Sequence, residues 1–262
     1  LMDGGVAPLL GFGDTMTVLR VAAELAQARA RGGVPPKRLL DCAPLDSGRM
    51  LDEARSKSAL GKAGLVTPEF RIATLGQVAE AATGLGFPVA LKVLSTEIAH
   101  KARVGGVRLN LRTRQEVIEA AAGIQSDVAA AIPAAQVDRF LVERMVSGAE
   151  AEFIIGIKRH AALGLAMMIG IGGTAVETGA AFGTLLLPLV EQDLDAALAR
   201  FGAAPGTARH QSLAKAARSV EAYALAHRSS LVTLDVNPLI VTAAGEAIAA
   251  DALIVLADEN EE

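Results

Sequence analysis

Hydrophobic positions recur along the chain with two different periods, and the change between them predicts alternating helices and strands. Between Asp14 and Arg31, apolar residues return every three or four positions, which predicts a helix with one apolar face. A proline pair then opens a stretch of poor periodicity that runs to Asp46 and is typical of a linker. We therefore expect the first helix to be separate from the segments that follow it.

Two capping-box patterns mark helix starts in the next part of the chain. They are TLGQ at 74–77 and TRQE at 113–116, and such pairs satisfy free backbone N–H groups of a first helical turn. We expect these helices to end near residues 84 and 132. These elements indicate a first α+β lobe at about 65–139. The pattern also predicts a helix at about 50–62 and strands at 68–73, 87–94 and 107–111.

From residue 140 onward, strands follow one another closely. Apolar runs at 140–146, 152–158 and 163–171 are linked by short turns, which favours an antiparallel sheet. We expect the fold class to be α+β (α/β), with this second lobe at about 140–258 and a binding site between the lobes. The remaining predicted elements are helices at about 192–201 and 212–227 and strands at 231–241 and 246–256.

Composition narrows the class of partner. Hydrophobic residues make up 52% of the 262 residues, which is ample for a buried core. The net charge of −4 and the 3% of aromatic residues count against a nucleic-acid partner. The single cysteine, Cys42, allows neither an internal disulfide nor a cysteine metal cluster. The sequence has no apolar run of the ~20 residues that a membrane span requires and no signal peptide, so we expect a cytoplasmic protein without a membrane partner.

Lys92 is a single charge within an otherwise apolar predicted strand. Burying a lysine without a partner is costly, so its ammonium group must meet an anion or reach water. A phosphate would suit this compact point charge. The alternative is a lysine at a sheet edge whose side chain extends to solvent.

The segment from His100 to Val107 joins cations to a glycine pair. Glycines allow the backbone to approach phosphate oxygens closely, and successive N–H groups can form an anion nest. Lys101 and Arg103 would add positive charge, and a ring nitrogen of His100 could accept a phosphoryl group. The alternative is a polar hairpin that turns at Gly105 and Gly106.

Two glutamates flank a turn at the start of the second predicted lobe. Glu143 ends one strand and Glu152 begins the next, and a carboxylate in either place could bind ribose hydroxyl groups. Met145 and Val146 could pack against an adenine while their backbone reads its edge. A solvated hairpin is the alternative for this segment.

Oxygen ligands cluster near the C-terminus. Asp235 and Asn237 are two apart in a predicted strand and therefore share one face, while Asp251 lies on the following strand and could sit opposite them. Such oxygens suit Mg²⁺, which uses few protein ligands together with phosphates and water. The alternative is an Asx turn at the end of a capped strand.

The ordered series of these motifs resembles the ATP-grasp domain of NDP-forming (ADP-forming) acyl-CoA synthetases, which are relatives of succinyl-CoA synthetase. The resemblance covers about residues 48–256. LDEARSKSALGKAGLVTPEF is similar to the family's opening helix and strand, and GFPVALKVLSTEIAHKARVGGVRLNL is close to its signature. LVERMV, EFIIGIKR, IGIGGTAVE, LDVNPLIV and ADALIVL follow in the family's order.

The N-terminal residues 1–31 resemble the end of a preceding CoA-ligase subdomain. We therefore expect residues 1–46 to be the remnant of that subdomain with a linker, and residues 47–262 to be the ATP-grasp domain. The chain begins at Leu1 rather than at a methionine, which indicates a processed chain or a piece of a longer polypeptide.

The resemblance implies a role for each nucleotide-site residue. Lys92 would bind ATP phosphates, and Gly105 and Gly106, with Val107 after them, would form the phosphate loop. The segment from Glu143 to Val146 would line the adenine pocket, with Glu152 on the sugar side. Asn237 and Asp251 would hold Mg²⁺, and Asp235 stands where the family often has Glu or Asp.

The resemblance also implies a reaction. His100 matches a histidine that some members phosphorylate as a relay. The family converts ATP, a small-molecule carboxylate and CoA to ADP, phosphate and acyl-CoA, and CoA is handled by CoA-binding and ligase domains of the same polypeptide or of an alpha subunit. We expect an oligomer, and we expect the isolated chain to bind Mg-ATP without making acyl-CoA.

Two departures from the family keep other functions open. The family often has an Asp and an Arg after the position of Glu177, but residues 178–185 read TGAAFGTL. Lys158-Arg159-His160 replaces a more usual Arg-Asp pair. The alternatives are an ATP-grasp carboxylate–amine ligase, which needs no phosphohistidine, and a nucleotide-sensing domain of a protein acetyltransferase.

Overall fold

The computed structural model describes residues 16, 45, 47–160, 163–173 and 182–257. The chain divides into two units, Leu1–Leu39 and Leu40–Glu262, and all the elements below belong to the second unit. The helix expected from Asp14 to Arg31, apart from Met16, lies outside the described residues, as does nearly all of the segment expected at 1–46. Within the described residues, no helix combines the length and the apolar character that crossing a membrane requires.

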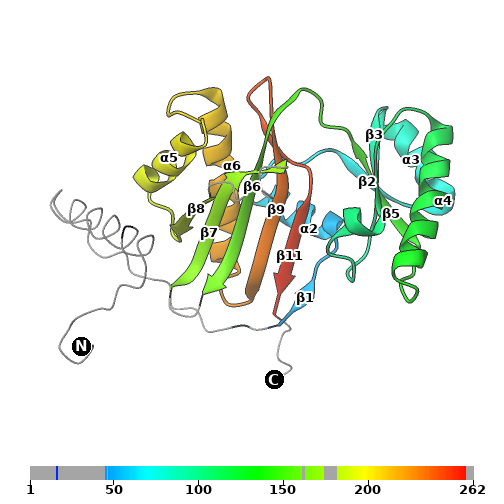
Figure 1. Ribbon diagram of the computed structural model, residues 1–262, viewed down its shortest axis with the longest axis horizontal. Helices are drawn as coiled ribbons and strands as arrows, with labels where there is room; N and C mark the ends of the chain where they lie inside the picture. The colour runs from blue at the N-terminus through cyan, green and yellow to red at the C-terminus, as the bar shows by residue number, and fades with distance from the viewer. Residues whose placement is uncertain (1–15, 17–44, 46, 161–162, 174–181, 258–262) are drawn as a thin grey trace. The chain divides into compact units, whose positions relative to one another are not determined.

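The smaller sheet has four strands in the order β2-β5-β3-β4, and each neighbouring pair is antiparallel. Helices α3 and α4 pack on it (Figure 1), and Val78, Ile124 and Phe140 belong to the shared buried core. The predicted capping box at Thr74 is formed. At Thr113 only half of the box is formed: the Glu116 N–H donates to Thr113 Oγ1 at 3.1 Å, but the Glu116 side chain accepts the Arg112 N–H instead of the Thr113 N–H. The elements are β2 (Phe70–Thr74), η2 (Leu75–Gln77), α3 (Val78–Leu85), β3 (Val89–Val93), η3 (Lys101–Val104), β4 (Val107–Leu111), α4 (Arg114–Ala131) and β5 (Arg139–Arg144).

The larger sheet has seven strands in the order β1-β11-β9-β6-β7-β8, with β10 paired to β9. All of these pairs are antiparallel, as the short turns predict. Side chains of α5, α6 and the sheet share one buried core. The elements are β1 (Arg49–Met50), β6 (Ala149–His160), β7 (Gly164–Ile171), β8 (Phe182–Leu186), α5 (Glu191–Arg200), α6 (Ala208–Ala226), β9 (Leu231–Thr242), β10 (Ala247–Ala249) and β11 (Ala252–Leu256).

Helix α2 (Glu53–Lys62) packs against both sheets. Leu60 is fully buried in the core of the larger sheet, whereas Ala54 packs with Leu94 and Leu141 of the smaller one. Asp52 caps the helix by accepting the Arg55 N–H at 2.8 Å. The helix therefore joins the two lobes, and it carries Glu53 and Lys57 into the junction.

One expectation about strand pairing was wrong, and two strands were not expected. The strand expected at 140–146 belongs to the smaller sheet as β5, so sheet membership changes after Arg144 rather than before Phe140. Its run of apolar residues fits any buried strand and does not show which strand it pairs with. Strands β1 and β8 were not expected, because a two-residue strand and a glycine-containing edge strand leave little pattern.

The strand expected at 246–256 is interrupted in its middle. Ala250 and Asp251 separate β10 from β11, although both strands pair with β9. The carbonyl oxygen of Ala250 instead accepts hydrogen bonds from Lys57 Nζ and Lys92 Nζ, both at 2.6 Å. This break places Asp251 beside the junction of the lobes.

Candidate functional site

A cavity of about 410 Å³ lies where residues of the two sheets face each other. This volume falls within the usual range for small-molecule sites. Eight of the predicted site residues line it, and Leu109, Pro238 and Ile240 add apolar surface. The eight are Lys92, Val107, Glu143, Met145, Val146, Glu152, Asn237 and Asp251.

The segment predicted to meet an adenine forms one wall of this cavity. Met145 and Val146 are half-buried there, and Glu152 is exposed at the start of β6. The Met145 N–H already donates to the carbonyl oxygen of Pro88 at 3.1 Å. A base edge therefore cannot use that donor while this bond holds, so the remaining polar backbone atoms would have to read it.

A second cavity of about 270 Å³ adjoins the first. His100, Lys101 and Arg103 line one side of it, and Asp235 lines another. Asn237 and Asp251 line both cavities, and this common boundary joins them. His100 is exposed to solvent at its cavity.

Asp235, Asn237 and Asp251 come together as the spacing predicts. The Asn237 N–H donates to the Asp251 carbonyl oxygen at 3.3 Å, and Leu253 is the register partner of Asp235. Burial raises the pKa of Asp235 to about 6, and the nearby Asp251 adds to this rise while His100 opposes it. Burial also raises the pKa of Asp251.

This donor set fits Mg²⁺ by its chemistry. Two carboxylates and one amide supply only hard oxygen atoms, and Mg²⁺ takes few protein oxygens alongside phosphates and water. Within the described ranges, no group of three or more His, Cys, Asp or Glu side chains is placed to hold a metal ion. The described residues therefore do not form a complete metal site by themselves. Asp235, Asn237 and Asp251 would hold Mg²⁺ together with the phosphates of a bound ligand.

Lys92 meets protein carboxylates in this structure. Its ammonium group lies 2.6 Å from Glu53 Oε1 and 2.8 Å from Glu143 Oε2, and it also donates to the carbonyl oxygen of Ala250. These contacts use all three of its N–H donors. Burial lowers the pKa of Lys92, but the carboxylates of Glu53 and Glu143 outweigh burial and raise it above its ordinary value. Of the two outcomes that the sequence left open for Lys92, an anion or water, the structure shows an anion, and Glu53 and Glu143 supply it.

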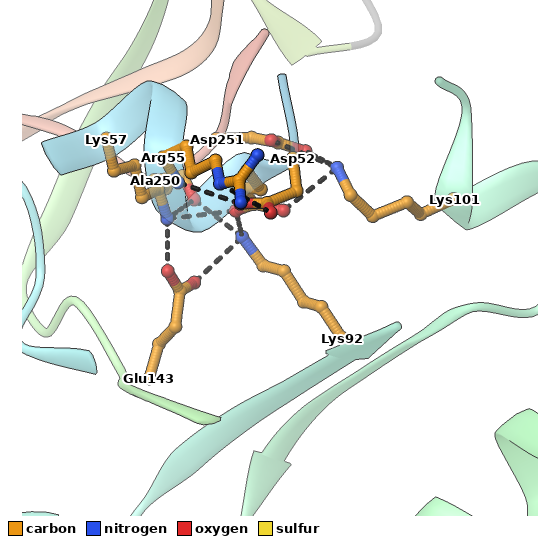
Figure 2. Close-up of polar contacts among 9 residues, drawn as sticks. Asp52, Arg55, Lys57, Lys92, Lys101, Glu143, Ala250 and Asp251 are labelled. Carbon is orange, nitrogen blue, oxygen red and sulfur yellow. Dashed lines mark hydrogen bonds and ion pairs between the residues drawn. The ribbon is translucent and has the colours of Figure 1, made fainter. Parts of the chain in front are cut away.

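Two further lysines complete a buried ionic cluster, which we call the junction cluster: Glu53, Lys57, Lys92, Lys101, Glu143 and Asp251. Lys57 is wholly buried and contacts both Glu53 and Glu143. Figure 2 shows its contact with Glu143. Lys101 Nζ lies 2.9 Å from Glu53 Oε2 and 3.3 Å from Asp251 Oδ1. Burial lowers the pKa of Lys101, but Glu53 and Asp251 outweigh this effect and raise it.

Comparison with known proteins identifies the family. A model of the ATP-grasp domain matches residues 43–256 of this chain. The chain belongs to the ATP-grasp domain family. This confirms the two-lobed fold expected from the order of the motifs.

Relatives of this ATP-grasp domain include ADP-forming acid–CoA ligases. The beta subunit of acetate–CoA ligase [ADP-forming] I from Pyrococcus furiosus is 32% identical over 146 residues, which are 55% of this chain and 62% of that protein. The corresponding Archaeoglobus fulgidus ligase is 35% identical over 134 residues, which are 51% of this chain and 19% of that protein. The chain thus spans less than two thirds of the length of either relative.

A solved structure extends the likeness to almost the whole chain. The acetyl-coenzyme A synthetase 1 of Ca. Korarchaeum cryptofilum, in complex with coenzyme A and Ca-AMPCP, matches with a TM-score of 0.71 and 25% identity. The match covers 89% of this chain and 98% of that chain. The shared fold supports the placement of both lobes in one ATP-grasp domain.

The glycine pair does not form the predicted anion nest. The Gly105 N–H donates to Ala102 O at 3.3 Å, and the Gly106 N–H donates to Lys101 O at 2.8 Å. Gly105 ends η3 with a φ of 68°, and a Cβ at Gly106 would lie 2.7 Å from Val93 Cγ1. The glycines close a tight turn that positions Lys101 and Arg103, and their N–H groups are already engaged.

Sequence reasoning missed Glu53 and Lys57. A glutamate and a lysine four positions apart on a helix usually form an exposed ion pair, so their pattern gave no sign of burial. Arg159 also departs from the family pattern, and here it bonds backbone, with Nε 3.0 Å from the Leu231 carbonyl oxygen. The family's Asp and Arg are absent from residues 178–185. Residues 178–181 of this stretch lie outside the described residues, and residues 182–185 belong to β8.

Proposed function

We propose that this chain binds Mg-ATP in the larger cavity and passes the γ-phosphoryl group to His100, as the nucleotide half of an ADP-forming acyl-CoA synthetase. The observation that carries the proposal is the common boundary of the two cavities at Asn237 and Asp251. Lys92 and apolar surface lie on one side of this boundary, and the candidate phosphoryl acceptor lies on the other with Lys101 and Arg103.

Each residue has a defined task in this scheme. Met145, Val146 and the apolar surface of Leu109, Pro238 and Ile240 hold the base, and Glu152 lies near the sugar. Lys92, Lys101 and Arg103 attract the phosphates, and Asn237, Asp251 and Asp235 hold Mg²⁺. The bound ion would neutralise phosphate oxygens, so charge compensation and positioning would supply most of the catalysis.

His100 would act as the nucleophile. A lone pair on one ring nitrogen forms a bond to the γ-phosphorus, and the bond from that phosphorus to the leaving oxygen of ADP breaks. The His100 ring is exposed to solvent and lines the second cavity, which leaves it accessible to a ligase partner. That partner would use the phosphoryl group to activate a carboxylate, and CoA would then displace phosphate to give acyl-CoA. Another structure of the Korarchaeum enzyme, whose match to this chain is 25% identical, contains a phosphorylated phosphohistidine segment. This similarity supports a histidine relay here.

Labelling with γ-labelled ATP tests this function. The chain should acquire acid-labile phosphate at His100 when it is present with its CoA-binding and ligase partner, and peptide mapping should locate the label. His100→Ala should lose this label and keep nucleotide binding. His160→Ala is the matched control because His160 is exposed on β6 and lines neither cavity. Equal labelling of the His100→Ala and wild-type proteins would refute the relay.

A nucleotide-sensing domain is the second candidate, because residues 178–185 lack the Asp and Arg that the family often has in this stretch. A sensing domain would bind Mg-ATP without transferring phosphate. Single-turnover assays on the complete protein separate the two, since only the synthetase releases ADP in step with acyl-CoA. A carboxylate–amine ligase would release ADP only with an amine acceptor and would tolerate His100→Ala.

A further inference from the structure

Glu53 lies between the two lysines that the proposed function assigns to the phosphates. It sits in the first turn of α2, and its side chain is wholly buried. Oε1 lies 2.6 Å from Lys92 Nζ and Oε2 lies 2.9 Å from Lys101 Nζ. One carboxylate thus bridges two ammonium groups with its two oxygen atoms.

A phosphate group would make the same kind of contact. It also presents several anionic oxygens to ammonium donors, and charge-assisted bonds of this type are short and strong. Lys92 lines the larger cavity and Lys101 lines the smaller one, so both can reach a ligand. Glu53 lines neither cavity and contacts both lysines. Because each ammonium has three donors, contacts to phosphate compete with the contacts to Glu53.

Lys57 keeps a counter-ion on Glu53 during such an exchange. It is four residues from Glu53 on α2, and its Nζ lies 3.0 Å from Glu53 Oε1. Its side chain is wholly buried and lines neither cavity. When Lys92 and Lys101 turn to a ligand, Glu53 retains this partner, which avoids the large penalty of an unpaired buried carboxylate.

We propose that Glu53 is an internal competitor of the nucleotide: it holds Lys92 and Lys101 when the site is empty and yields them to the phosphates, with Lys57 as its permanent counter-ion. This inference rests on the proposed nucleotide site. It assigns Glu53 and Lys57 to the control of affinity through the two lysines, without any contact to the nucleotide.

The formal charges of the junction cluster set the expected signs. Three lysines balance three carboxylates, so Glu53→Gln leaves a surplus positive charge and removes the competitor. Lys57→Met leaves Glu53 dependent on Lys92 and Lys101 and adds a surplus negative charge. The first change should strengthen nucleotide binding and the second should weaken it, whereas general damage to the junction would weaken binding in both variants.

Calorimetric titration with Mg-ADP and Mg-ATP tests these signs. We expect the Kd to fall on the order of tenfold in Glu53→Gln and to rise on the order of tenfold in Lys57→Met, which is a typical size for coupling between sites. Glu80→Gln is the matched control, because Glu80 is exposed on α3 and its loss removes the same charge. It should leave the Kd unchanged.

The double variant Glu53→Gln/Lys57→Met guards against a folding failure. It keeps the junction cluster neutral with two lysines and two carboxylates, and it should bind Mg-ADP more tightly than the wild type. Binding no tighter than wild type in this folded variant would overturn the competitor role. Absence of nucleotide binding by the folded wild type and by every variant would instead refute the proposed function, so the two failures are distinguishable.

Discussion

Lys57 on α2 and Glu143 on β5 form an ion pair that joins the two sheets, with exposed side-chain fractions of only 0% and 3%. The pair ties α2, the helix that packs against both sheets, to a strand of the smaller sheet. Replacing Lys57 therefore removes a partner from a carboxylate that has almost no access to water.

The first prediction concerns the stability of this junction. Lys57→Met should lower the free energy of unfolding by about 3–5 kcal/mol, because it leaves buried carboxylate charge uncompensated. Urea denaturation followed by circular dichroism measures the change. Lys62→Met is the control, since Lys62 is an exposed lysine on the same helix. A loss in Lys57→Met no larger than that of the control would show that the junction does not depend on this ion pair.

The second prediction is a pH dependence of stability that arises from Glu53. Burial raises the pKa of Glu53, but the fields of Lys57, Lys92 and Lys101 outweigh burial and bring it well below its ordinary value of 4.5. A carboxyl group with a depressed folded-state pKa adds stability above its unfolded value, and that stability is lost as the pH falls toward the folded value.

Urea unfolding at several pH values from about 6 down to about 3 measures this dependence, and wild type should lose about 2 kcal/mol more than Glu53→Gln over that interval. Glu80→Gln should follow the wild-type curve. Parallel curves for wild type and Glu53→Gln would show that the depressed pKa of Glu53 does not contribute to stability.

The third prediction concerns the turn at Gly106. A Cβ there would lie 2.7 Å from Val93 Cγ1 and 3.0 Å from the Lys101 carbonyl oxygen. Gly106→Ala should therefore lower the free energy of unfolding by about 1–3 kcal/mol through overpacking. Gly76→Ala is the control, because a Cβ at Gly76 would meet no atom within 4 Å. Thermal unfolding of the two variants gives the comparison, and equal losses would contradict the tight turn.

The fourth prediction tests the Mg²⁺ ligands by binding. Asn237→Ala should weaken the Mg²⁺-dependent part of ADP binding by about 10–100-fold, the range seen for groups that support metal ligands. Titration of Mg²⁺ at fixed ADP measures it. Gln115→Ala provides the control, since Gln115 is exposed on α4 and lines neither cavity. An unchanged Mg²⁺ requirement in Asn237→Ala would remove Asn237 from the ligand set.

Local patterns in the sequence were sufficient for the helices, most strands and part of the site. The helix caps at Thr74 and Thr113 act within four residues, so their helices could be located without knowledge of the fold. Asp235 and Asn237 share a strand face by the two-residue period alone. Their convergence with Asp251 followed from the short connection between two neighbouring strands.

Long-range pairing decided the rest. An apolar run such as that of β5 fits either sheet, and only the antiparallel register with β2 and β3 assigned it to the smaller one. Glu53 and Lys92 are 39 positions apart, and no local period connects them. Charged residues on a helix are usually exposed, so the burial of Glu53 and Lys57 depends on two sheets closing around α2. The sequence by itself thus determined that Lys92 needs an anion or access to water, and only the tertiary structure decided that Glu53 on α2 and Glu143 on β5 supply the anion.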